Sequence, residues 1–196
     1  MIQVHRVPFS TNVERVALAA AYKRIEVEWI DHLDDDRSEV VRVSGQELVP
    51  VLVDGDLVLP DSEAILRLFD ERVPEPPLWP RDRARCAEVD VFVEWFNRWW
   101  KRAPNLIAAG QGDEAKYGPR ITEAFDRFEA LLDGREYLYG EFGVADVIAF
   151  PFLKYAVDTN EDDADPFHEV LRRWQPIDGR PNLEAWIRRI DALPRA

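Results

Sequence analysis

The chain has 196 residues, of which 46% are hydrophobic and seven are tryptophan, which is enough for one large packed core or two smaller ones. Its formal net charge of −13 argues against nucleic acid as a partner, because such binding relies on Lys and Arg side chains that neutralise phosphates. The same charge disfavours binding to an anionic membrane surface. No apolar run approaches the ~20 residues of a membrane span and the N-terminus lacks a signal-peptide pattern, so we expect a cytoplasmic protein without a membrane partner.

The few sulfur and imidazole side chains argue against both disulfides and metals. Cys86 is the single cysteine, which excludes an internal disulfide and fits a reducing compartment. The three histidines are dispersed at His5, His32 and His168, so no spacing resembles a zinc site. The acidic runs at 31–36 and 160–165 lack calcium-loop spacing and are interpreted as solvated loops. We therefore expect no metal.

The first part of the chain alternates short strand patterns with helical ones. We expect strands at 2–7, 25–30, 51–53 and 57–59, a short segment at 38–43, and amphipathic helices at 11–22 and 61–73. The pattern predicts a small α/β domain over residues 1–73.

A proline-rich linker follows at residues 74–80, where four of seven residues are proline and cannot continue a helix or donate to a strand ladder. Beyond it the strand patterns disappear. We expect helices at 81–103, 119–132, 144–157, 166–174 and 181–193. The pattern predicts an all-helical domain over residues 81–196.

The end of the first strand places a hydroxyl beside the start of the first helix. Thr11 and Glu14 fit a capping box, with Thr11 as the N-cap and Glu14 reaching back to it. In that interpretation Ser10 lies just outside the helix. The unpaired N–H groups and the dipole at such a helix start favour an anion, so a thiolate held near Ser10 would be stabilised.

Two further segments combine capping with possible ligand binding. Pro50 opens an apolar strand and removes one ladder donor, which leaves backbone groups of Val49 for another partner; by base rate alone the Val49–Pro50 bond would be trans. Asp61 and Ser62 open the third helix, and one of them suffices as N-cap. The pair could instead bind an amino-acid head group, with the carboxylate on the ammonium and Ser62 on the α-carboxylate.

These segments occur in an order that is informative as a set: Phe-Ser-Thr-Asn-Val-Glu-Arg-Val at 9–16, Leu-Val-Pro-Val-Leu at 48–52, and Asp-Ser-Glu-Ala-Ile at 61–65. With the proline-rich linker, the helical second half and Arg-Pro-Asn-Leu-Glu-Ala-Trp at 180–186, the chain resembles a glutathione S-transferase of the bacterial, serine-type kind. The resemblance implies a thioredoxin-like N-terminal domain that binds glutathione and an all-helical C-terminal domain.

The resemblance also assigns roles to residues. Ser10 stands at the catalytic serine or cysteine position, Val49 beside a cis Pro50 contacts the cysteinyl part of glutathione, and Asp61 and Ser62 bind the γ-glutamyl head. The helical domain is implied to supply most of the electrophile pocket. For that pocket we name Phe9, Asn12, Trp95 and Trp99, although aromatic residues at the i, i+4 spacing of the two tryptophans more often form a core or a partner surface.

The sequence departs from the family pattern at two places. Gly143 replaces the usual Ser or Thr cap of a buried helix, where Asp146 can still cap from inside the first turn. Lys23 and Arg24 fill the place of the glycine that normally ends the first helix. Arg37 is the candidate for the glycine-end carboxylate of glutathione.

We therefore expect a homodimeric glutathione transferase, typical of detoxification enzymes, with glutathione as co-substrate and Ser10 favouring its thiolate for attack on a hydrophobic electrophile. The alternatives are a glutathione-dependent lyase, isomerase or dehalogenase, and a non-catalytic glutathione-binding or interaction protein of the same fold. A thiol oxidoreductase is disfavoured because that branch needs a cysteine at position 10.

Overall fold

The computed structural model describes residues 1–33, 35–160 and 162–196. The chain divides into two compact units. The first comprises Met1–Leu78 together with Leu193–Ala196, and the second comprises Trp79–Ala192.

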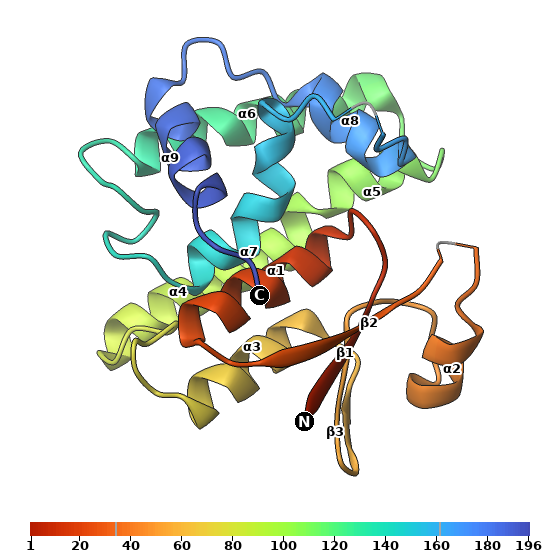
Figure 1. The fold of residues 1–196 in the computed structure, drawn as a ribbon. Helices are drawn as coiled ribbons and strands as arrows, with labels where there is room; N and C mark the ends of the chain where they lie inside the picture. Colours follow the sequence, from red (N-terminus) through yellow and green to blue (C-terminus); the bar gives the residue numbers. More distant parts are fainter. Residues whose placement is uncertain (34, 161) are drawn as a thin grey trace. The chain divides into compact units, whose positions relative to one another are not determined.

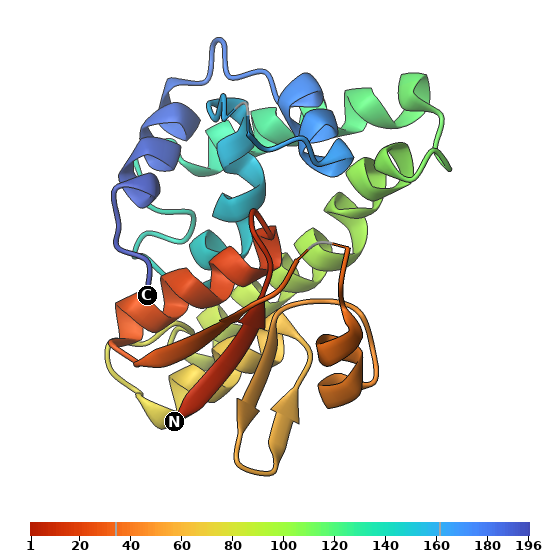
Figure 2. The same ribbon diagram turned by 45° about the vertical axis from the view of Figure 1, so that its right-hand side comes forward.

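In the described residues of the first unit, four strands form one sheet in the order β2-β1-β3-β4. β1 is parallel to β2 and antiparallel to β3, and β3 is antiparallel to β4. The elements are β1 (Ile2–Arg6), α1 (Thr11–Lys23), β2 (Val27–Asp31), α2 (Ser38–Ser44), β3 (Val51–Asp54), β4 (Leu57–Leu59) and α3 (Ser62–Arg72). Helices α1 and α3 pack against each other, whereas α2 lies apart from them near β4 (Figure 1, Figure 2). The predicted α/β organisation of this half is confirmed.

The start of α1 differs from the sequence-based expectation. Ser10, not Thr11, is the N-cap: its Oγ accepts a hydrogen bond from the Val13 N–H at 3.4 Å. Thr11 is the first helical residue and is buried. Glu14 does not close a capping box with Thr11, because its carboxylate pairs with Arg195 at 3.0 Å. The prediction of a Thr11 cap was therefore wrong, since a serine one residue earlier competes for the same helix N–H groups.

The end of α1 explains the departure at Lys23 and Arg24. Arg24 adopts the left-handed conformation at φ 55°, the backbone region that favours glycine. Lys23 is buried, and its ammonium pairs with Asp70 and donates to the carbonyl oxygens of Val73 and Pro76 at 2.8 and 2.5 Å. The lysine therefore ties α1 to the end of α3 and to the proline-rich segment that follows.

The second unit is helical throughout its regular elements. They are α4 (Arg83–Trp95), the π-helical segment η1 (Phe96–Trp100), α5 (Arg102–Ala108), α6 (Glu114–Leu131), α7 (Val144–Leu153), the 3-10 turn η2 (Lys154–Ala156), α8 (Pro166–Trp174) and α9 (Pro181–Asp191). Figure 2 shows these helices in green to blue. The predicted all-helical second half is confirmed, although the long helix expected at 81–103 is interrupted by the π segment.

The start of α6 was predicted too late. The helix begins at Glu114 and includes Pro119, because Asp113 caps it by accepting the Ala115 N–H at 3.0 Å. Pro119 is the sixth residue of α6 and lacks the N–H that would pair with the Ala115 carbonyl, yet the helix continues through it, so Pro119 does not begin the helix as expected.

The buried cap of α7 follows the expectation from the resemblance. Gly143 is the N-cap, and Asp146 Oδ2 accepts the Gly143 N–H at 3.0 Å. The other oxygen, Oδ1, accepts the Leu138 N–H at 3.0 Å and the Trp186 indole N–H at 2.8 Å. Asp146 thus joins α7, the preceding loop and α9 within the helical unit.

Among the residues that the structure describes, no helix combines sufficient length with sufficient hydropathy to cross a membrane.

Candidate functional site

The strand register brings three distant segments to one end of the sheet. His5 pairs with Val51 and Leu52 pairs with Leu59 in antiparallel ladders. The end of β1, the start of β3 and the end of β4 therefore lie at the same edge. Ser10 follows β1, Pro50 precedes β3 and Asp61 follows β4, so the proposed glutathione-binding residues share this edge.

The Ser10 hydroxyl can accept one hydrogen bond and donate another at the same time. Its Oγ accepts the Val13 N–H as the cap of α1, which uses a lone pair of the oxygen. The hydroxyl proton is not needed for that cap and can be donated to another group. Capping and thiolate stabilisation are therefore compatible roles of one serine.

Phe9 and Asn12 flank Ser10 at the same helix start. Phe9 is 46% exposed and has a φ of 59°, which is a strained conformation for a residue with a bulky side chain. Asn12 is half-buried in the first turn of α1. The structure thus places an exposed aromatic ring directly before the capping serine.

The Val49–Pro50 peptide bond is cis, as the resemblance implied. Pro50 is buried and Val49 is half-buried. In the described part of the chain, the backbone hydrogen bonds outside helices and strands include neither the N–H nor the C=O of Val49. Neither backbone group of Val49 is therefore engaged in those hydrogen bonds.

Asp61 and Ser62 have different surroundings although they are adjacent. Asp61 is exposed and caps α3 through Oδ1, which accepts the Ala64 N–H at 2.9 Å. Ser62 is buried, and its Oγ accepts a hydrogen bond from the Arg15 guanidinium at 3.4 Å. Asp61 is therefore the residue whose second carboxylate oxygen can meet an ammonium group.

Arg15 is a residue that the sequence analysis did not select. Its side chain is only 2% exposed, and burial lowers the pKa of the guanidinium to about 9, so the group remains cationic at neutral pH. With the N-termini of α1 and α3, it adds positive potential where Ser62 lies. The available signal was an arginine inside an alanine-rich helix whose neighbours Val16 and Ala17 are apolar.

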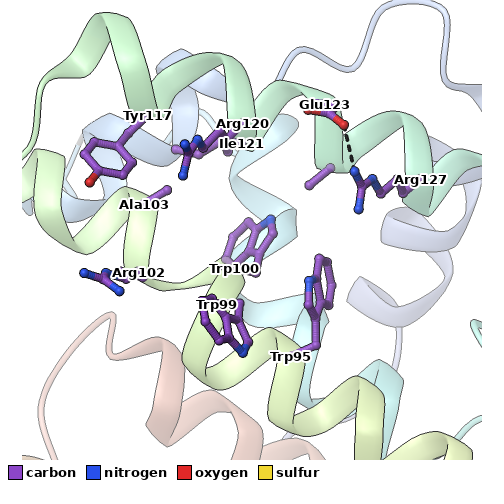
Figure 3. Close-up of a pocket in the computed structure, with 11 residues that line it drawn as sticks. Trp95, Trp99, Trp100, Arg102, Ala103, Tyr117, Arg120, Ile121, Glu123 and Arg127 are labelled. Carbon is purple, nitrogen blue, oxygen red and sulfur yellow. Dashed lines mark hydrogen bonds and ion pairs between the residues drawn. The ribbon is translucent and has the colours of Figure 1, made fainter.

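The predicted electrophile residues of the helical half line a cavity inside the second unit (Figure 3). Trp95 and Trp99 form part of one wall, and α6 forms the opposite wall. The cavity has a volume of about 500 Å³, which is within the size range of small-molecule pockets. Phe9 and Asn12 belong to the first unit, so the four residues named for this pocket come from two different units.

Comparisons with known proteins agree with this organisation. Residues 4–77 match the family model of the glutathione S-transferase N-terminal domain, and residues 115–189 match that of the C-terminal domain. Glutathione S-transferase Z1 of Arabidopsis thaliana is 43% identical over 190 residues, which covers 89% of this chain and 86% of that protein.

Solved structures share the fold at lower sequence identity. The β-etherase LigF of Sphingobium sp. strain SYK-6 superimposes with a TM-score of 0.78 at 16% identity, covering 97% of this chain and 95% of that one. A bacterial zeta-class maleyl pyruvate isomerase gives 0.70 at 23% identity, covering 95% and 91%. The first unit is therefore a thioredoxin-like domain, and the second is the helical domain that accompanies it. The chain belongs to the glutathione S-transferase family and is a glutathione transferase enzyme.

Proposed function

We propose that this enzyme binds glutathione at the edge formed by Ser10, Val49–Pro50 and Asp61–Ser62, and that Ser10 donates a hydrogen bond to the glutathione sulfur. The thiolate then attacks an electrophilic carbon of a hydrophobic substrate. The serine is not the nucleophile. The observation that carries the proposal is the position of Ser10 as the cap of α1, with its hydroxyl proton not required by the cap.

The energies involved are sufficient for thiol activation. A thiol with a pKa near ~8.5 is only a few per cent ionised at neutral pH, and lowering that pKa by ~2 requires about 3 kcal/mol of preferential thiolate stabilisation. One hydrogen bond to a charged group contributes ~1.5–3 kcal/mol. The helix N-terminus adds ~0.3–1 kcal/mol. Together these terms reach the required size.

The glutathione contacts follow from the same edge of the sheet. The Val49 backbone N–H and C=O would pair with the cysteinyl residue of glutathione through backbone hydrogen bonds of the kind that join two strands. Asp61 would take the γ-glutamyl ammonium, and Ser62 with the N-terminus of α3 would take the α-carboxylate. The Arg15 guanidinium, hydrogen-bonded to Ser62, favours a carboxylate at this place.

Binding and turnover test the proposal in two steps. Retention on immobilised glutathione, with elution by free glutathione, tests the binding edge. A panel containing an activated aryl halide, an electron-poor cis-alkene acid and a β-aryl ether then separates transfer, isomerisation and ether cleavage. Binding without turnover of any panel member would favour a non-catalytic glutathione-binding protein.

We also propose that the enzyme is a cytoplasmic homodimer. The family usually forms dimers, and Val91 of α4 remains 69% exposed in the single chain, so a second copy that covers it would remove apolar surface from water. Light scattering at micromolar concentration tests the dimer directly. A mass near the 22.7 kDa of one chain would contradict it.

A further inference from the structure

We propose that the cavity of the helical unit is a binding site for a planar aromatic molecule that carries an anionic group. Binding at this cavity is measured without glutathione; only the further idea that the bound molecule is the electrophile rests on the proposed function. The aromatic walls of the cavity, the charged side chains that line it and one buried indole N–H support this assignment.

The walls of the cavity suit a flat aromatic ring. Trp95, Trp99 and Trp100 come from α4 and η1, and Tyr117 of α6 lines the cavity at its other end (Figure 3). Aromatic faces and edges bind other aromatic rings in stacked and edge-on arrangements. Trp99 is 67% exposed, so a ligand that covers it would remove a large apolar surface from water.

The π-helical segment sets the position of two of these rings. Trp99 and Trp100 both lie in η1 (Phe96–Trp100) and both line the cavity. Such π segments are rare and occur frequently at functional sites. Trp100 is held from behind, because it stacks on Phe96 at 4.5 Å and meets Phe152 edge-on at 6.1 Å. Its ring is therefore fixed before any ligand arrives.

The rim of the cavity is cationic although the whole chain is acidic. Arg102, Arg120 and Arg127 line it, and Glu123 is its single acidic residue. Arg127 pairs with Glu123 at 2.7 Å. Among the residues that the structure describes, neither Arg102 nor Arg120 forms an ion pair. In a chain of net charge −13, two such guanidinium groups beside an aromatic cavity favour an anionic ligand.

A buried donor completes the site. Trp100 is only 5% exposed, and its Nε1 finds no hydrogen-bond acceptor in the described part of the chain. In Figure 3 this nitrogen lies on the edge of the ring that points toward α6, across the cavity. A buried donor without a partner is unfavourable. A ligand oxygen that accepts a hydrogen bond from the Trp100 indole N–H would therefore gain more binding free energy than one that accepts from an exposed donor. A carboxylate can accept from Trp100 and still face a guanidinium.

The test uses the purified full-length enzyme and two matched probes, 1-naphthoate and the uncharged 1-naphthamide. Binding is followed by calorimetry and by quenching of tryptophan fluorescence, without glutathione. We expect the carboxylate to bind at least about tenfold more tightly than the amide, as one charge-assisted hydrogen bond implies.

Three variants locate the binding. Arg102→Gln and Arg120→Gln should each remove much of the preference for the carboxylate, and Trp100→Phe, which keeps a ring but loses the N–H, should weaken both probes. Arg98→Gln is the matched control, because Arg98 is exposed, pairs with Glu94 at 2.8 Å and does not line the cavity. It should bind like the wild type.

Two kinds of result, on anion selectivity and on stoichiometry, would overturn the proposal. Equal affinity for the two probes, or equal behaviour of Arg120→Gln and Arg98→Gln, would mean that the arginines do not select an anion. Probe binding that is lost on dimerisation, seen as a falling stoichiometry at rising protein concentration in light scattering and calorimetry, would assign the cavity to a second copy of the chain. Neither result depends on glutathione, so failure here leaves the proposed function untouched.

Discussion

The guanidinium of Arg15 donates a hydrogen bond to the Oγ of Ser62 at 3.4 Å, although 47 positions separate the two residues. Both side chains are buried, and Asp61 and Glu63 raise the pKa of Arg15 against the effect of burial. The contact joins the second turn of α1 to the first residue of α3. It also places a buried positive charge next to the residues proposed to bind the γ-glutamyl group.

Asp61→Ser should weaken glutathione binding while preserving the start of α3. Serine keeps an acceptor for the Ala64 N–H, so the cap survives. The lost carboxylate leaves the γ-glutamyl ammonium without its partner, and we expect a loss of ~1–3 kcal/mol in binding free energy by calorimetry. Asp82→Ser is the control, because Asp82 Oδ1 caps α4 by accepting the Arg85 backbone N–H at 2.9 Å. Unchanged affinity in Asp61→Ser would reduce Asp61 to a helix cap.

Lys23→Met should strongly destabilise the first unit. The ammonium is fully buried with Asp70 and two carbonyl oxygens, and removing one member of a buried charged cluster costs about 3–5 kcal/mol. Urea unfolding measures this change. The control Arg42→Met removes an exposed pair with Glu39 and should cost under about 1 kcal/mol. Equal costs for the two variants would show that the buried lysine contributes no more than a surface charge.

Arg24→Gly should raise the free energy of unfolding by about 0.5–1 kcal/mol. Arg24 occupies the left-handed region at φ 55°, which costs an L-residue roughly 1–2 kcal/mol, partly offset by the greater freedom of glycine in the unfolded chain. Arg24→Ala keeps the Cβ and should show no such gain. If alanine and glycine stabilise equally, the backbone conformation is not the cause.

Much of the fold could be predicted from the sequence because strand alternation, proline punctuation and helical periodicity are local. The N-cap of α1 could not be predicted, because Ser10 and Thr11 are both good cap residues. In addition, Glu14 forms an ion pair with Arg195 from the far end of the chain, which no local pattern reveals. The start of α6 was missed because Asp113 caps it ahead of Pro119.

The candidate site was predictable only in part. Asp61 and Ser10 carry recognisable local signals, whereas the contribution of Arg15 depends on contact with Ser62 across two helices. The positive charge that lines the cavity could not be predicted from a local pattern either, because Arg102 and Arg120 come from separate helices.

The pH dependence of stability should contain a contribution from Asp146. Its burial raises the carboxyl pKa from 3.8 to about 6. Between these values the unfolded chain has already lost the proton while the native state retains it. The stabilising contribution is therefore complete below about pH 4 and is lost as the pH rises through about 6.

Asp146→Asn removes that titration and serves as the comparison. The free energy of unfolding of the wild type, relative to this variant, should fall by about 2–3 kcal/mol between pH 4 and the neutral range. Chemical denaturation at several pH values measures the difference. A difference that is flat with pH, together with an Asp146 carboxyl resonance that titrates near pH 4 by NMR, would contradict the raised pKa.

The proposed mechanism depends on Ser10. The effect of a Ser10 variant on the thiol must therefore be separated from its effect on the helix cap. Ser10→Ala removes both the cap acceptor and the hydroxyl donor, so we expect a loss of about 0.5–2 kcal/mol in stability in addition to its effect on the thiol. Thr11→Ala removes a neighbouring buried hydroxyl and is the matched control. Turnover should fall at least about tenfold in Ser10→Ala alone, equivalent to ~1.4 kcal/mol.

The most direct measurement is the ultraviolet absorbance of the thiolate of bound glutathione as a function of pH. We predict that the wild-type and Thr11→Ala complexes titrate together, at least about one pH unit below the Ser10→Ala complex, because one hydrogen bond to the sulfur accounts for ~1.5–3 kcal/mol of thiolate stabilisation. If the wild-type and Ser10→Ala complexes titrate at the same pH, Ser10 does not activate the thiol and the proposed mechanism is wrong.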